Sequence, residues 1–109
     1  EPAVVKAAVG DTVHFVPTDM AHNSESVPGL IPEGAAGWKG EMNQKISVTL
    51  DKEGVYVYKC APHTVMAMVG VVVADNPTNL DDVKANSASL SATFAMNKDR
   101  LDKYLGQLN

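Results

Sequence analysis

The chain has 109 residues, of which 45% are hydrophobic and 20% are charged, and its formal net charge is −4. A chain of this length forms one domain with a buried core, and no apolar run approaches the ~20 residues that a membrane-spanning helix needs. The acidic balance, without clustered Lys and Arg, argues against a nucleic-acid partner. We therefore expect a soluble domain that neither spans a membrane nor binds a nucleic acid.

The first predicted strand covers residues 12–16, where Val13 and Phe15 alternate with polar neighbours. Alternation with a period of two is typical of a strand with one buried face, and it directs His14 toward solvent. Gly and Pro then recur through residues 27–40, which predicts a mostly irregular segment. The chain is expected to return to regular strands only after this segment.

Two β-rich runs follow within residues 45–60, and we interpret them as a hairpin with its turn at 51–54. Residues 68–74 form a β-branched apolar run, which indicates a strand that is buried on both faces. Short strands separated by turn signals are typical of a β-sandwich or barrel, here over residues 1–74.

The pattern changes to helical spacing after residue 75. Leu80 and Val83 share one face of a predicted short helix. A longer helix is expected to carry the apolar residues Leu90, Phe94, Leu101, Leu105 and Leu108. Residues 1–109 are thus predicted to be a single domain, with a helical tail at 75–109 that packs on the sandwich.

The loop between the last two predicted strands concentrates soft metal ligands. It holds the only cysteine, Cys60, which cannot form an intramolecular disulfide, and it places His63 and Met68 at Cys-x2-His-x4-Met spacing. A site of two His, one Cys and a weak axial Met is typical of blue-copper electron-transfer centres. The fourth ligand should be His22, at a strand end, because His14 is expected to face solvent.

Other interpretations of these residues stay open. A lone cysteine is often a small buried hydrophobe, and Met66 and Met68 are also plausible core residues. Zinc is possible, although structural zinc sites favour several Cys or His ligands over a thioether. Two rival functions are a thiol enzyme with Cys60 as nucleophile and His63 as base, and a carrier that moves copper itself.

The segments TDMAHNSES, LIPEGA, GVYVYKCAPH and NPTNLDDVK, together with Met68, resemble the pseudoazurin family of bacterial cupredoxins over essentially the whole chain. The resemblance implies an all-β, Greek-key cupredoxin sandwich with two C-terminal α-helices. It also implies one type 1 copper held by His22, Cys60, His63 and Met68. The expected function is a non-enzymatic periplasmic shuttle that carries single electrons to a partner such as a copper nitrite reductase.

The resemblance also implies roles for residues around the ligands. Asn23 would donate a hydrogen bond toward the Cys60 sulfur, or else simply form a turn. Tyr56 and Tyr58 share strand parity with Cys60, so at least one should pack beneath the site. Family members begin with a further strand before the segment that matches Glu1, so that strand is expected to be missing from this sequence.

Docking of the redox partner is expected around the copper loop. The apolar surface would include Met20, Pro62, His63 and Met66, with Lys39 and Lys59 on its rim. Met20 and Glu41 stand where lysine is usual in the family, and Thr64 replaces a usual aromatic residue. These departures predict a less basic surface, so either the partner differs from the family's usual one or the encounter is slower and depends less on salt.

Overall fold

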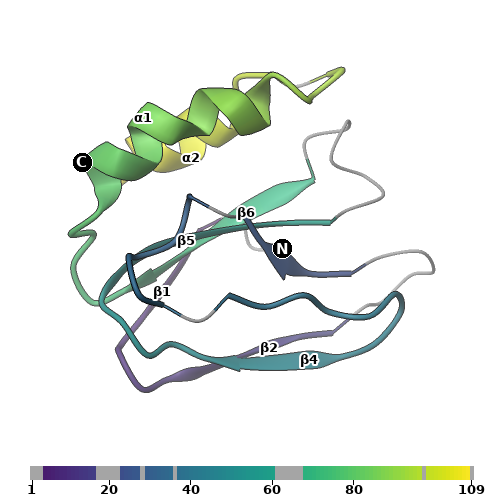
Figure 1. The fold of residues 1–109 in the computed structure, drawn as a ribbon, viewed down its shortest axis with the longest axis vertical. Helices are drawn as coiled ribbons and strands as arrows, with labels where there is room; N and C mark the ends of the chain where they lie inside the picture. The colour runs from purple at the N-terminus through teal and green to yellow at the C-terminus, as the bar shows by residue number, and fades with distance from the viewer. Residues whose placement is uncertain are drawn as a thin grey trace.

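A computed structural model describes residues 4–16, 23–27, 29–35, 37–60, 68–96 and 98–108 of the chain. Its elements in chain order are β1 (Val4–Ala7), β2 (Thr12–Phe15), β3 (Glu25–Ser26), β4 (Ile46–Thr49), β5 (Gly54–Lys59), β6 (Val69–Ala74), α1 (Leu80–Ser91) and α2 (Arg100–Gly106). They form three layers, with the two helices over one sheet and a second sheet beneath it (Figure 1). The predicted β-sandwich with two C-terminal helices is confirmed. No helix within the described ranges is long and apolar enough to cross a membrane.

The middle layer is a four-stranded sheet with the order β1-β6-β5-β3. Strands β1 and β6 run parallel, whereas β5 is antiparallel to both β6 and β3. The β6 strand has one intermediate residue and five buried ones. Val71 and Val73 pack in the helix-side core, and Val72 and Ala74 pack in the core between the sheets. The predicted strand buried on both faces is therefore confirmed for Val69–Ala74, whereas Met68 precedes the strand and is exposed.

The second sheet in the described part of the chain pairs β2 with β4 in antiparallel register. Its inner side chains, such as Val13 and Val48, pack against the core between the sheets, while His14 is exposed. The prediction that His14 faces solvent is confirmed. In contrast, the predicted hairpin across residues 45–60 is wrong, because β4 and β5 belong to different sheets. The β-rich composition of the two runs identified both strands, but composition carries no information about which strands pair.

Helix α1 runs further than the sequence predicted. It includes Leu90 and ends at Ser91, so the longer helix is the first one. Phe94 lies between the helices, and α2 has only seven residues, with Leu101 and Leu105 buried. Apolar spacing alone did not reveal this break, because Phe94 is buried (2% exposed) although it lies outside a helix.

The tail is fixed to the sandwich by Asn79, the residue before α1. Its Oδ1 accepts a hydrogen bond from the Val55 N–H at 2.6 Å, and its Nδ2 donates to the Val55 carbonyl at 3.0 Å. Both peptide groups of a β5 residue are thereby satisfied by one side chain. Because β5 leads directly to Cys60, this contact also anchors the strand that carries the metal-site candidate.

Tyr56 is buried at the centre of the core between the sheets (1% exposed). Its hydroxyl donates to the Lys52 carbonyl at 2.7 Å and accepts from the Lys52 N–H at 3.1 Å. Burial raises the pKa of Tyr56 above its usual 10.0, with Asp51 adding to the rise and the Lys52 backbone bond opposing it. The folded protein therefore holds this proton more tightly than the unfolded chain does.

Tyr56→Phe should lower the free energy of unfolding at pH 7 by about 1–2 kcal/mol, because both bonds to Lys52 are lost. The difference from wild type should shrink as the pH rises above 10.0. In that range Tyr56 loses its proton more readily in the unfolded chain than in the folded protein, which destabilises wild type but not the Phe variant. Urea unfolding followed by circular dichroism between pH 7 and pH 11 measures this. A difference that stays constant across the range would show that the Tyr56 hydroxyl does not titrate differently on unfolding.

Candidate metal centre

Cys60 and Met68 lie opposite each other, just after the last residue of β5 and just before the first residue of β6. Cys60 directly follows β5, and its N–H donates to the Met68 carbonyl at 3.0 Å. This bond adds one pair to the ladder, beyond Lys59 and Val69. Residues 61–67, which join the two positions and include His63, lie outside the described residues. The backbones at the two ends of the loop therefore meet, while the predicted convergence of Cys60, His63 and Met68 on one ion stays a prediction.

The two sulfur residues differ in exposure. Cys60 continues the alternation of Tyr56 and Tyr58, so its side chain projects into the space between the sheets, and it is only 3% exposed. Met68 is 41% exposed. Tyr56 packs in the core between the sheets, as predicted for at least one of the two tyrosines, and its hydroxyl reaches Lys52; its place under the proposed site stays a prediction. A buried thiol and an accessible thioether at one end of a sandwich are suitable ligands for a metal near the surface.

Strand β3 brings a third segment to the same end. Glu25 pairs with Lys59, so the preceding Ser24 approaches the position of Cys60. Asn23, half-buried, donates from its Nδ2 to the Gly40 carbonyl at 3.1 Å. The predicted bond from Asn23 toward the Cys60 sulfur stays a prediction. Sequence reasoning did not find β3, because two residues are too few for an alternating pattern.

Trp38 holds residues 24–26 in place through hydrogen bonds to Ser24 and Ser26. Its Nε1 donates to the Ser24 Oγ at 3.0 Å, and its own N–H donates to the Ser26 Oγ at 2.9 Å. The Ser26 N–H donates back to the Trp38 carbonyl at 2.8 Å, and the Gly40 N–H donates to the Ser24 carbonyl at 2.7 Å. A Cβ at Gly40 would lie 2.9 Å from the Ser24 carbonyl oxygen, so this close approach needs glycine. We call these contacts the Trp38 clamp.

The donor set favours a soft metal. Thiolate and thioether ligands select copper rather than hard cations such as calcium or magnesium. His22, the proposed fourth ligand, lies outside the described residues but directly precedes Asn23. His14, its competitor, is exposed on the β2–β4 sheet with its Nδ1 2.7 Å from the Ser47 Oγ. In the described ranges, no group of three His, Cys, Asp or Glu side chains is placed to hold a metal ion.

Burial also bears on the thiol-enzyme alternative. A nucleophilic cysteine needs access to its substrate, and reactive cysteines are partly exposed in electropositive surroundings. Cys60 is 3% exposed and continues a strand whose neighbouring residues are in the core. These observations favour the role of an anchored metal ligand over that of a nucleophile.

Comparison with known proteins agrees with this interpretation. The family described as "Copper binding proteins, plastocyanin/azurin family" matches residues 1–75. A pseudoazurin of Paracoccus pantotrophus is 41% identical over 110 residues, which cover all of this chain and 72% of that protein. The structure of a pseudoazurin from Sinorhizobium is 44% identical with a TM-score of 0.89, over 99% of this chain and 81% of that one. Pseudoazurin from Hyphomicrobium denitrificans gives 44% identity and a TM-score of 0.87, over 99% and 83%.

A two-sheet sandwich with a buried cysteine and a methionine meeting at one end, matched over residues 1–75 by a copper-binding family, is a cupredoxin domain. Similarity over nearly the whole chain specifies the family further, and the chain belongs to the pseudoazurins. It is accordingly a blue copper electron-transfer protein that binds one type 1 copper.

The Trp38 clamp predicts a measurable coupling between Trp38 and Ser24. Trp38→Phe keeps an aromatic ring but removes the Nε1 donor, so it should lower the free energy of unfolding by about 1–3 kcal/mol. Ser24→Ala removes the acceptor, and the double variant should cost less than the sum of the two, by about 1 kcal/mol. Urea unfolding followed by circular dichroism gives the four values. Strict additivity would mean that this bond does not stabilise the fold.

Proposed function

We propose that His22, Cys60, His63 and Met68 hold the copper, and that the protein carries single electrons between redox proteins without catalysing a net reaction. The observation that supports this most is the hydrogen bond from the Cys60 N–H to the Met68 carbonyl, which brings the backbones of the two sulfur-containing residues together. The two histidines lie outside the described residues, and their assignment rests on the resemblance and on the loop spacing. The bound copper supplies a one-electron couple.

The protein's own residues keep this site rigid. Cys60 is fixed by its bond to Met68 and by the β5 ladder, while the Trp38 clamp fixes the segment that follows His22. Close-packed surroundings of this kind resist rearrangement, because a shift of one side chain must move its neighbours. We infer that the ligand positions change little between the two oxidation states, which favours rapid transfer of an electron.

Lys39 and Lys59 are proposed to attract the partner. Both lie one residue from a site segment: Lys59 precedes Cys60, and Lys39 precedes Gly40 in the Trp38 clamp. Cationic side chains near a docking surface increase the rate of encounter with an acidic partner. The apolar part of the proposed surface consists of Met20, Pro62, His63 and Met66, which lie outside the described residues. The proposed partners are periplasmic redox proteins, such as a copper nitrite reductase.

Titration of the metal-free protein with copper(II), followed by visible absorption, tests the ligand assignment. Wild type should develop an intense blue thiolate-to-copper band that saturates at one equivalent, and Cys60→Ala should develop none. Met68→Ala should still bind copper but with a changed spectrum and reduction potential. Met96→Ala, which truncates another exposed methionine (51% exposed), serves as the matched control and should behave as wild type. A blue Cys60→Ala variant would refute the assignment.

Charge reversal tests the docking lysines. Lys39→Glu and Lys59→Glu should each slow electron transfer to a copper nitrite reductase by about three- to tenfold at low ionic strength, and high salt should reduce the effect. Lys6→Glu makes the same charge change on β1, at the other edge of the middle sheet, and should have little effect. Stopped-flow absorption at the blue band measures the rates. Equal rates for all three variants would remove Lys39 and Lys59 from the interface.

A further inference from the structure

A carboxylate lies between the two docking lysines. Glu25 pairs with Lys59 in the β3–β5 ladder, and it also forms an isolated antiparallel bridge with Lys39 on its other side. Residues directly opposite each other in antiparallel strands project from the same face of a sheet. Glu25 therefore shares one face with both lysines, and the order of charges across the three segments is positive, negative, positive. We call these residues the Lys-Glu-Lys row.

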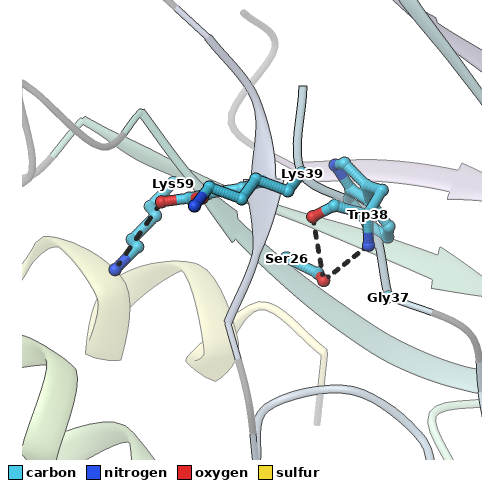
Figure 2. Close-up of a pocket in the computed structure, with 6 residues that line it drawn as sticks. Ser26, Gly37, Trp38, Lys39 and Lys59 are labelled. Atoms are coloured by element: carbon cyan, nitrogen blue, oxygen red, sulfur yellow. Dashed lines mark hydrogen bonds and ion pairs between the residues drawn. The ribbon is translucent and has the colours of Figure 1, made fainter. Parts of the chain in front are cut away.

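The side chains in the row differ in solvent exposure. The Lys59 Nζ lies 4.0 Å from the Glu25 Oε1, and their side chains are 28% and 13% exposed. Lys39 is exposed. Figure 2 shows the Lys39 side chain extending toward Lys59, whereas Trp38 points the other way. The row lines a surface groove together with Ser26, Gly37 and Trp38. An anion that entered this groove would meet two ammonium groups and one carboxylate, a local charge of +1.

We propose that Glu25 is a built-in counter-ion of the docking surface, and that a carboxylate of the partner replaces it as the ionic contact of Lys59 while the neighbouring Lys39 adds a second positive charge. This inference rests on the proposed function, because it concerns the lysines through which the redox partner would dock. Glu25 holds Lys59 toward the groove before the partner arrives. The Lys59 side chain therefore loses less conformational entropy when the complex forms. Glu25 also lowers the attraction at long range, so the encounter is slower and less dependent on salt than two lysines alone would give.

The 4.0 Å separation fits such an exchangeable contact. It is longer than the 2.7–2.9 Å typical of charge-assisted hydrogen bonds, so Glu25 and Lys59 interact mainly through their charges. A partner carboxylate that approaches from solvent can form a shorter bond to Lys59 or to the exposed Lys39. Glu25 is largely buried and stays in place, so its repulsion of the incoming carboxylate also limits how long the complex lasts.

Glu25→Gln tests the proposal, because glutamine has nearly the same shape but no charge. The matched control is Glu33→Gln, which also removes one negative charge from an exposed residue. Glu33 follows Pro32, which lies beside Gly54 at the start of β5, whereas the Lys-Glu-Lys row lies at the end of that strand. Each copper(I)-loaded protein would be oxidised by hexacyanoferrate(III), which takes one electron from the protein and becomes hexacyanoferrate(II). We expect Glu25→Gln to react about twofold or more faster than Glu33→Gln at low ionic strength, with the difference lost at high salt.

Two further measurements complete the test. A cationic oxidant, tris(phenanthroline)cobalt(III), should react more slowly with Glu25→Gln than with Glu33→Gln, because the extra positive charge repels it. A fluorescent hexaglutamate peptide, followed by anisotropy, should bind Glu25→Gln at least about twofold more tightly at low salt, and the added substitution Lys39→Gln should abolish this gain. Equal rates and equal peptide binding for Glu25→Gln and Glu33→Gln would overturn the proposal, as would a slower reaction with hexacyanoferrate(III).

Failure of the proposed function would look different. A metal-free protein that gives no blue band with copper(II) would refute the copper assignment, whatever Glu25 does to peptide binding. A normal blue band in both variants, combined with identical responses to the anionic and cationic probes, would refute only the role of Glu25. The peptide measurement needs no electron transfer, so it reports on the Lys-Glu-Lys row independently of the copper.

Discussion

The structure depends on how the antiparallel ladder between β5 and β6 ends. Six residue pairs align the strands, from Gly54–Ala74 to Lys59–Val69, and the Cys60–Met68 hydrogen bond extends that alignment by one pair. A shift of one residue would turn Cys60 from the core toward the opposite face and separate it from Met68. The buried valines of β6, which pack on both faces of the sheet, make such a shift costly. The metal-site candidate is thus positioned by core packing far from the loop itself.

A second consequence concerns the edge of the middle sheet. Strand β3 has only two residues, yet it connects β5 to the segment around Trp38 and brings Glu25, Lys39 and Lys59 onto one face. Ser26, the next residue in β3, accepts a hydrogen bond from the Trp38 N–H, and Trp38 packs in the core between the sheets. Packing inside the sandwich and charge outside it are therefore set by the same short pairing. A change that loosened β3 would therefore affect both the Trp38 clamp, beside the proposed ligands, and the charged residues of the proposed docking surface.

The sequence was sufficient for some of these features and not for others. Alternation identified β2, β-rich and apolar runs identified β4, β5 and β6, and the Cys-x2-His-x4-Met spacing identified the loop whose ends the structure brings together. Pairing was not predictable in the same way, so the hairpin between β4 and β5 was wrong. The position of Glu25 between two lysines depends on long-range pairing through a two-residue strand, which leaves no periodic signal. The ligand roles of His22, Cys60, His63 and Met68 remain predictions.

Trp38 is the only tryptophan of the chain, and it is 9% exposed with its indole N–H bonded to Ser24. Because Ser24 directly follows Asn23 and approaches Cys60, the indole lies against the segment that leads to the proposed ligand His22. An indole that moves from an apolar, hydrogen-bonded position into water changes its emission wavelength. The protein therefore carries its own optical reporter, whose fluorescence follows the order of one ligand segment without any added label.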